Sequence, residues 1–268
     1  MTQEILVLGA TGKTGRRVVA ALGKTDVTVR AASRSSAVRF DWDDRSTWRP
    51  ALAGTTGVYL IAPHDPADAA PFVELAEQQG VRRVVLLSGR NLDRLPIDVF
   101  TNMHAAEAAV RASTLDWTVL RANNFTQNFS DDVWAQEVRA GRLPLPVDDT
   151  PEPFIDVRDV ADVAVKALTE DHAGRTYELS GPIGVTFADG LKKIAARTGR
   201  PVELVRLTPE EYHAELLSHG VPEPAAAELN GMFDAMRKGL LATPTDDVSG
   251  LLGRAPIDFD TYVADTWR

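Results

Sequence analysis

The stretch Val7-Leu8-Gly9-Ala10-Thr11-Gly12-Lys13-Thr14-Gly15-Arg16 decides the fold of this chain. It follows the apolar run 5–8 and leads into residues 16–22, whose apolar side chains recur at helical spacing. The segment therefore predicts a strand, a glycine turn and a helix. In such a turn one glycine allows the bend, a second lets the backbone approach a pyrophosphate, and a third lets helix and strand pack closely. Three-glycine matches also occur by chance, so the flanking strand and helix are what favour dinucleotide binding at the helix N-terminus.

The composition is that of an ordinary globular protein. The chain has 268 residues, of which 44% are hydrophobic and 25% charged, enough for a sizeable core. It contains no cysteine, which excludes disulfides, thiolate metal sites and a cysteine nucleophile. The histidines show no paired metal-ligand spacing beyond a loose His213/His219, so we expect no metal site.

Charge and hydropathy favour a small-molecule partner. The formal net charge of −9 opposes binding to nucleic acid and to anionic membranes. No apolar run approaches the about twenty residues that span a bilayer, and the first residues lack the pattern of a signal peptide. We therefore expect a cytoplasmic protein. The sequence leaves the oligomeric state open, a homodimer included.

Strands and helices alternate through the first half of the chain. Residues 27–31, 38–41, 57–61, 83–87 and 117–120 read as further strands, and 71–79 and 102–113 as helices. Because the strands are almost continuously apolar, the pattern predicts an α/β fold with a doubly wound parallel sheet.

The rhythm changes beyond Arg121. Four prolines between residues 144 and 153 predict extended or looped chain. Helices resume at 157–168, 187–197, 209–218 and 224–238, with strands only at 175–179 and 202–207. We expect residues 1–150 to form the dinucleotide-binding core. Residues 151–268 would mainly form a smaller, mostly helical region that caps the carboxyl ends of the strands and builds the substrate pocket, with some segments returning to the core.

The end of the second predicted strand indicates the type of dinucleotide. NAD-preferring folds place an acidic residue there for the ribose hydroxyls, whereas residues 30–36 contain no Asp or Glu. Arg34 could bond a 2′-phosphate, with Lys13 as a second positive charge, so NADPH is favoured over NADH. The alternative is that Arg34 is a solvated surface arginine. Further cofactor contacts are expected at strand ends, from Asp41, Ala62, Pro63 and Ser88.

By these residues the chain resembles the short-chain dehydrogenase/reductase superfamily, and more closely its atypical NmrA-like branch, which includes quinone oxidoreductases, triphenylmethane-dye reductases and dinucleotide-sensing regulators. The resemblance extends over nearly the whole chain. It rests on the order of the segments 9–15, 40–42, 80–85, the helix with His104 and Glu107, 117–125, 154–161 and 220–224.

The resemblance implies a catalytic arrangement that is incomplete here. The wider superfamily uses a Tyr with a Lys four residues on, and none of the four tyrosines of this chain has such a lysine. The family's lysine position falls at Met103, and the adjacent His104 is the nearest titratable side chain. We expect His104 to donate a proton or bond the nicotinamide ribose, unless it is structural. Ser88 occupies the family's serine position.

Without the dyad, a hydride acceptor that disperses charge over its own π-system is favoured, such as a quinone or another conjugated molecule. Asn123 and Asn124 follow the sixth strand, where the resemblance implies the nicotinamide end. Core packing is an equal or stronger explanation for several of the candidate substrate contacts. These contacts are Phe125, Asn128, Trp134, Met232 and Phe233.

The sequence thus predicts an NADPH-dependent oxidoreductase that transfers hydride to a quinone-like or otherwise conjugated small molecule, with NADH as a possible substitute. A non-catalytic, NADP(H)-sensing regulatory protein is the alternative, and the missing Tyr and Lys raise its weight.

Overall fold

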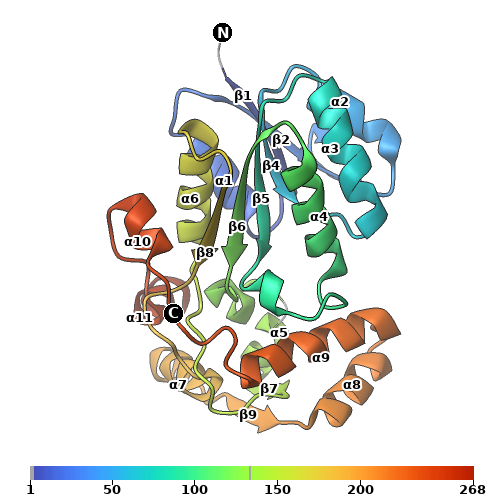
Figure 1. The fold of residues 1–268 in the computed structure, drawn as a ribbon. Coiled ribbons are helices and arrows are strands. Elements are labelled where there is room, and N and C mark those ends of the chain that lie inside the picture. Colours follow the sequence, from blue (N-terminus) through green and yellow to red (C-terminus); the bar gives the residue numbers. More distant parts are fainter. Residues whose placement is uncertain (1–2, 133) are drawn as a thin grey trace.

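A seven-stranded parallel sheet forms the centre of the computed structural model, which describes residues 3–132 and 134–268 (Figure 1). The strand order is β3-β2-β1-β4-β5-β6-β8. It reverses between β1 and β4, which is the point where ligands bind in open parallel sheets. The predicted doubly wound α/β fold is confirmed. The strands are β1 (Glu4–Leu8), β2 (Thr28–Ser33), β3 (Val38–Arg39), β4 (Gly57–Ile61), β5 (Arg83–Gly89), β6 (Asp116–Ala122) and β8 (Arg175–Leu179).

Helices cover both faces of the sheet, and β1 shows why. Its side chains alternate, so Ile5 and Val7 enter the hydrophobic core on one face while Leu6 and Leu8 enter the core on the other. The first face is covered by α1 (Gly15–Leu22), α6 (Val157–Thr169) and α10 (Asp247–Leu252). The second is covered by α2 (Trp48–Leu52), α3 (Ala69–Gln78) and α4 (Thr101–Ala112).

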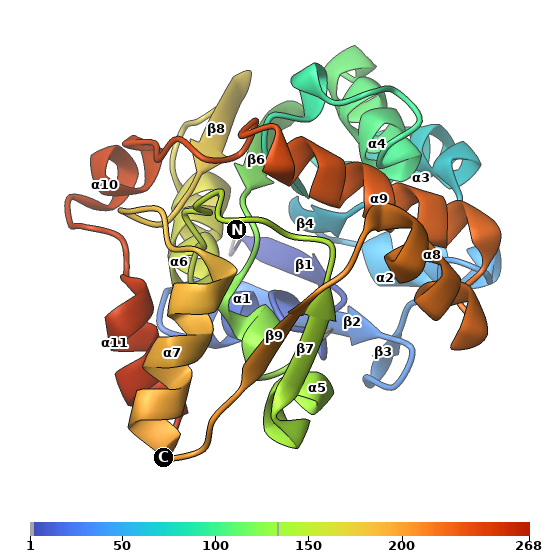
Figure 2. The same ribbon diagram turned by 90° about the horizontal axis from the view of Figure 1, so that it is seen from below.

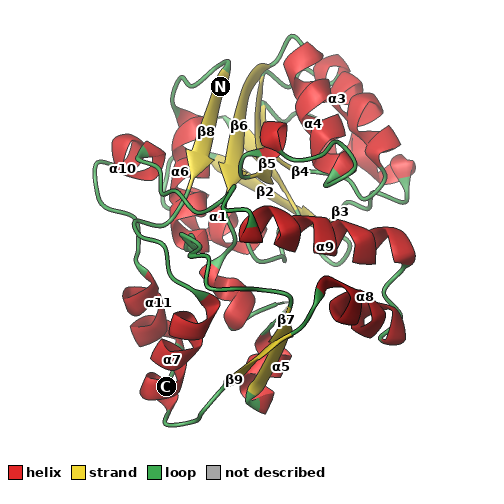
Figure 3. Ribbon diagram, turned by 60° about the horizontal axis from the view of Figure 1, so that its bottom comes forward, coloured by secondary structure: helices red, strands yellow, loops and turns green. Residues whose placement is uncertain are grey.

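A second, smaller body lies at the carboxyl ends of the strands (Figure 1). Its own core is built around the aromatic side chains Phe129, Phe154, Phe187 and Phe259. Seen from below, α9 crosses under the sheet beside α4 and α8 (Figures 2 and 3). The elements are α5 (Ala135–Ala140), β7 (Arg142–Leu145), α7 (Phe187–Thr198), β9 (Glu203–Arg206), α8 (Pro209–Ser218), α9 (Glu223–Arg237) and α11 (Phe259–Thr266). Single 3-10 turns occur at Arg45–Thr47, Pro66–Asp68, Leu92–Arg94 and Thr126–Phe129.

The structure differs from the sequence-based expectation in two strands. The segment 175–179, expected in the C-terminal region, is β8 and pairs with β6 as the last strand of the core sheet. The proline-rich segment contains β7, which includes Pro144 and pairs in parallel with β9. Proline is tolerated there because this two-stranded sheet consists of edges only. The short helices α2, α5, α10 and α11 were not predicted.

In the described ranges, no helix combines the length and the apolar character that a membrane crossing requires.

Candidate functional site

Two cavities meet at the carboxyl end of β4. The smaller, of about 310 Å³, lies over the ends of β1 and β2, and the larger, of about 660 Å³, lies between the ends of β4 to β6 and the C-terminal body. Ile61, Ala62 and His64 belong to the walls of both. The two cavities are therefore neighbours that share a wall at the point where the strand order reverses.

The glycine turn between β1 and α1 has the close packing that its sequence predicts. Gly9 has a positive φ of 62°, and a Cβ there would lie 2.8 Å from the Cδ1 of Ile61. A Cβ at Gly15 would lie 2.2 Å from the carbonyl oxygen of Gly9, which is fixed backbone. Gly9 and Gly12 line the smaller cavity, while Gly15 brings α1 against the turn. These glycines hold open a backbone surface of the kind that a diphosphate occupies.

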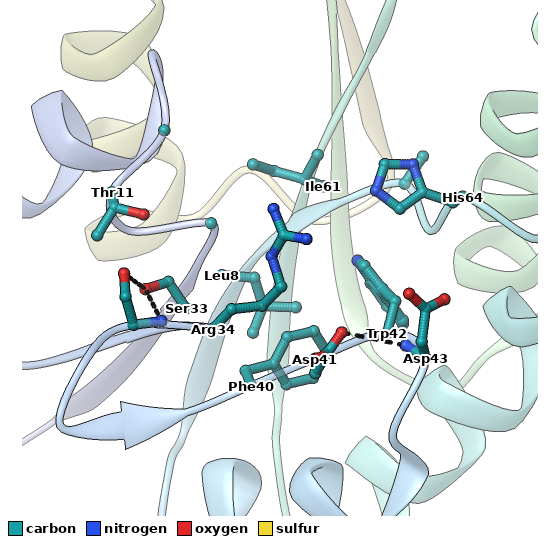
Figure 4. Close-up of a pocket in the computed structure, with 14 residues that line it drawn as sticks. Leu8, Thr11, Ser33, Arg34, Phe40, Asp41, Trp42, Asp43, Ile61 and His64 are labelled. Carbon is teal, nitrogen blue, oxygen red and sulfur yellow. Dashed lines mark hydrogen bonds between the residues drawn. The ribbon is translucent and has the colours of Figure 1, made fainter.

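Arg34 stands in the smaller cavity without a counter-ion. It follows β2 directly, and its guanidinium is drawn between Thr11 and His64 in Figure 4. In the described part of the chain no carboxylate forms an ion pair with it, although Asp41 and Asp43 line the same cavity. The loop beside it is folded by Ser33, whose hydroxyl accepts hydrogen bonds from the backbone amides of residues 35 and 36. An exposed guanidinium in a cavity wall suits a phosphate ligand.

Lys13 lies in the larger cavity instead. Its ammonium donates hydrogen bonds to Asn128 and, at 2.6 Å, to Asp132, and it lies 5.0 Å from the centre of the Phe125 ring. Burial lowers the pKa of the Lys13 ammonium, opposed by Asp132. Lys13 and Arg34 line different cavities, so the structure does not bring the two cations together, and their joint contact with a 2′-phosphate stays a prediction.

Ser88 lines the larger cavity, but its hydroxyl is part of a buried ion-pair network. Ser88 Oγ donates a 2.7 Å hydrogen bond to Glu107 Oε1, and Arg121 binds both oxygens of Glu107 at 2.8 and 2.9 Å. Although burial opposes ionisation, the hydrogen bonds from Arg121 and Ser88 hold the pKa of Glu107 below its ordinary value. The network fixes the end of β5 against α4 and β6.

His104 lines neither cavity among the described residues. Its Nε2 is buried and has no hydrogen-bond partner in that part of the chain. Met103, at the family's lysine position, does line the larger cavity, beside Phe100. Phe100 has a φ of 57°, a conformation that a bulky residue rarely adopts and that is enriched at functional sites.

Asn123 and Asn124 both line the larger cavity, and their amides hold its walls together. The Nδ2 of Asn123 donates to the carbonyl oxygens of Pro153 and Leu241, at 3.4 and 3.2 Å. The Nδ2 of Asn124 donates to Oε1 of Glu152 at 3.1 Å. Glu152 is 2% exposed, and burial raises its pKa to about 8.

The remaining predicted residues fall into three groups. Thr11, Asp41 and Ala62 line the smaller cavity, with Ala62 shared, and the substrate candidates Phe125, Asn128, Trp134, Met232 and Phe233 all line the larger one. Phe233 also belongs to the C-terminal core, so it packs there as well as lining the cavity, and its contact with substrate stays a prediction. Thr14 and Pro63 line neither among the described residues, and the Pro63 carbonyl accepts a 3.0 Å bond from Asn102.

Sequence reasoning missed several wall residues, among them His64, Trp42, Arg90 and Tyr212. Arg90 follows β5 directly and His64 comes three residues after β4, so their position at carboxyl strand ends was a usable signal. Tyr212 reaches the site from α8, and nothing in the local sequence indicates that. It stacks edge-on with Phe233, with ring centres 5.3 Å apart.

Comparison with known proteins decides the family. Residues 9–171, from the glycine turn after β1 through α6, match the family described as NAD(P)H-binding. This chain belongs to the NAD(P)H-binding family. The match includes the glycine turn and Arg34, so the expected dinucleotide binding is confirmed.

Full-length relatives and solved structures agree with this assignment. The chain is 31% identical to a (4-alkanoyl-5-oxo-2,5-dihydrofuran-3-yl)methyl phosphate reductase of Streptomyces griseus, over 97% of each chain. Its fold is similar to the NADPH-dependent quinone oxidoreductase of Escherichia coli complexed with NADPH, with a TM-score of 0.81 at 22% identity over 97% of this chain and 99% of that one.

The fold is also similar to that of Nmra, a negative transcriptional regulator, in complex with NAD, with a TM-score of 0.74 at 13% identity over 99% of this chain and 95% of that one. The predicted membership of an NAD(P)H-dependent oxidoreductase family is confirmed, and the likeness to Nmra shows a shared fold.

Proposed function

We propose that this member of the NAD(P)H-binding family is an NADPH-dependent reductase of quinone-like or otherwise conjugated small molecules. The observation that carries the proposal is that the smaller cavity adjoins a larger, mostly apolar one, with Ile61, Ala62 and His64 in the walls of both. A dinucleotide in the smaller cavity would therefore extend its reactive end toward space for a second molecule.

The residues of the smaller cavity fit NADPH. Gly9 and Gly12 leave backbone exposed where a side chain would block it, and the N-terminus of α1 follows. Arg34 has no counter-ion among the described residues, so a 2′-phosphate could be its partner. Asp41 and Trp42 line the part of the cavity beyond Arg34, where they would contact the adenine.

The larger cavity supports an acceptor that needs no strong acid from the protein. Bound NADPH would supply the reducing equivalent, and one NADPH with one proton would reduce one quinone to the hydroquinone. The role of the protein is then to hold a flat acceptor and exclude water. Phe125 and Met103 offer apolar surface for this, and the Lys13 ammonium lies where it can stabilise negative charge on the acceptor or the cofactor.

The named relatives support the acceptor class. The Streptomyces griseus relative is a reductase of an unsaturated, ring-conjugated carbonyl compound by its name, and the Escherichia coli structure is that of a quinone oxidoreductase. Both acceptors disperse incoming charge over a π-system. We propose that Ser88 positions the cavity wall, since its hydroxyl donates a hydrogen bond to Glu107. We assign His104 no contact with the acceptor.

The experiment is to titrate the purified protein with NADPH and NADH by fluorescence, and then to follow nicotinamide absorbance with a panel of quinones, enones and dyes. We expect tighter binding of NADPH and many turnovers on at least one conjugated acceptor. Tight binding with no oxidation across the panel would contradict the reductase and favour an NADP(H)-sensing regulator.

A further inference from the structure

Two cations and no carboxylate belong to the wall of the larger cavity. Among its described wall residues, Lys13 and Arg90 carry positive charge, His64 is the remaining basic side chain, and none is Asp or Glu. The counter-ions of both cations, Asp132 and Glu178, are not part of the wall. A ligand inside the cavity therefore meets the cations before it meets their partners.

Arg90 is the more unusual of the two cations. It follows β5, is 5% exposed, and donates one hydrogen bond of 2.8 Å from Nη2 to the carbonyl oxygen of Thr243. Its Nη1 is buried and has no hydrogen-bond acceptor among the described residues, and its Nε forms an ion pair with Glu178 without a well-aligned hydrogen bond. A buried arginine normally has its donors satisfied, so the unpaired Nη1 needs an explanation.

The nearby carboxylate of Glu178 does not satisfy the Nη1 donor of Arg90, because Glu178 also binds other groups. Glu178 Oε2 lies 3.2 Å from Arg90 Nε and accepts a 3.0 Å hydrogen bond from the backbone amide of Asn91. Its other oxygen lies 3.1 Å from Arg121 Nη1. The Glu178 carboxylate thus interacts with two arginines and one backbone amide. Asn91 itself has a φ of 51°, and this left-handed residue turns the chain immediately after Arg90.

We propose that Arg90 binds an anionic substituent of the acceptor, such as a sulfonate, carboxylate or phosphate, so that this enzyme prefers negatively charged conjugated acceptors over neutral ones and disfavours cationic ones. The proposal deepens the proposed function and rests on it for the identity of the ligand as an acceptor. Arg90 is a specificity residue, and it takes no part in the transfer of electrons.

The test compares a naphthoquinone sulfonate with the unsubstituted naphthoquinone in the wild type, in Arg90→Gln and in Arg94→Gln. Arg94 is an exposed arginine four residues on that lines neither cavity, so it is the matched control. We expect Arg90→Gln to lower the ratio of kcat/KM for the sulfonate over the neutral quinone by about ten- to a hundredfold. Arg94→Gln should leave this ratio unchanged. The comparison between variants cancels the difference in reactivity between the two quinones.

A binding measurement separates this proposal from the proposed function. Naphthalene sulfonate cannot be reduced, and its dissociation constant is measured by calorimetry without cofactor, against naphthylmethanol and naphthylmethylammonium. We expect the wild type to bind the sulfonate most tightly and the ammonium most weakly, and this order needs no variant in case Arg90→Gln does not fold.

Equal binding of the sulfonate and the ammonium would overturn the anion site even if naphthoquinone is reduced. Arg90-dependent binding of the sulfonate without turnover of any quinone would overturn the reductase and leave the anion site standing.

Discussion

The Ser88 hydroxyl donates a 2.7 Å hydrogen bond to Glu107, a carboxylate that is 5% exposed and is held from the other side by Arg121. The family resemblance predicts a role in catalysis for this serine, which lies at the end of the fifth strand of the sheet. Here its proton points to a buried anion rather than to the cavity. The geometry makes Ser88 a residue that positions the wall.

Removing the anion should destabilise the protein. Glu107→Gln leaves Arg121 buried with fewer counter-charges, and we expect it to lower the free energy of unfolding by roughly 3 kcal/mol at neutral pH. Because the folded pKa of Glu107 is depressed, its contribution is present above the unfolded value of about 4.3 and is lost as the pH falls through the folded pKa. Urea denaturation at pH 7 and below 4 measures this. Glu170→Gln, at an exposed ion pair with Lys166, is the control and should have no measurable effect.

Ser88→Ala distinguishes positioning from proton donation. We expect a loss of about 1–3 kcal/mol in the free energy of unfolding, because a buried charged acceptor loses a donor. A proton donor would instead lose about a hundredfold or more in kcat. Denaturation and steady-state rates on the same samples decide between them, and a hundredfold fall in kcat at unchanged stability would contradict the positioning role.

Arg34 and Lys13 should affect the two cofactors differently, since they line different cavities. Arg34→Glu should weaken the binding of NADPH by about ten- to a hundredfold and leave the binding of NADH little changed, because only NADPH carries the 2′-phosphate. Lys13→Met should weaken both by a similar factor. Fluorescence titration of each variant with each cofactor gives the four ratios, with Arg49→Glu on the exposed face of α2 as the control. A loss of affinity for NADPH alone in Lys13→Met would show that Lys13 binds the 2′-phosphate.

Gly15 should tolerate no side chain. A Cβ at this position would lie 2.2 Å from the Gly9 carbonyl oxygen, and neither helix nor strand can move without opening the turn. We expect Gly15→Ala to lower the melting temperature and abolish NADPH binding. Gly23, at the other end of α1, has a φ of −61° and space for a Cβ, with the nearest atom at 3.4 Å. Gly23→Ala should therefore keep both properties, by thermal melting and titration, and equal behaviour of the two variants would be evidence against the close packing.

The fold was predictable because its signals are local. The turn 9–15 lies between a strand and a helix that are both indicated by their apolar pattern. The alternation of apolar strands and helices then predicts a parallel sheet. The place of β8 was not predictable in this way. Its residues alternate like those of any short strand, and only the pairing with β6 assigns it to the core sheet.

The site was predictable where it follows strand ends and unpredictable where it depends on tertiary contacts. Arg34 comes directly after β2 and Phe125 three residues after β6, so topology alone brings them to one edge. The direction of Lys13 depends on Asn128 and Asp132, which are more than a hundred residues away. The environment of Arg90 likewise depends on Glu178, which is shared with Arg121, and no spacing in the sequence contains this relationship.

Glu152 gives the last prediction, because it is a carboxyl that the fold keeps protonated. It is 2% exposed behind Asn124, and burial raises its pKa to about 8, opposed by the amide of Asn124 and the charge of Arg90. The unfolded chain releases this proton near pH 4.3, while the folded chain retains it until about pH 8. Stability should therefore fall as the pH rises through this interval, by up to about 1.4 kcal/mol per pH unit from this group.

Glu152→Gln keeps the shape of the side chain and removes its ionisable carboxyl group. Urea denaturation of both proteins between pH 5 and pH 8 should show the variant gaining stability relative to the wild type as the pH rises. Glu203→Gln, an exposed residue of β9, serves as the control and should run parallel to the wild type. A constant difference between Glu152→Gln and the wild type across this range would mean that Glu152 is ionised in the folded protein, paired through space with Arg90.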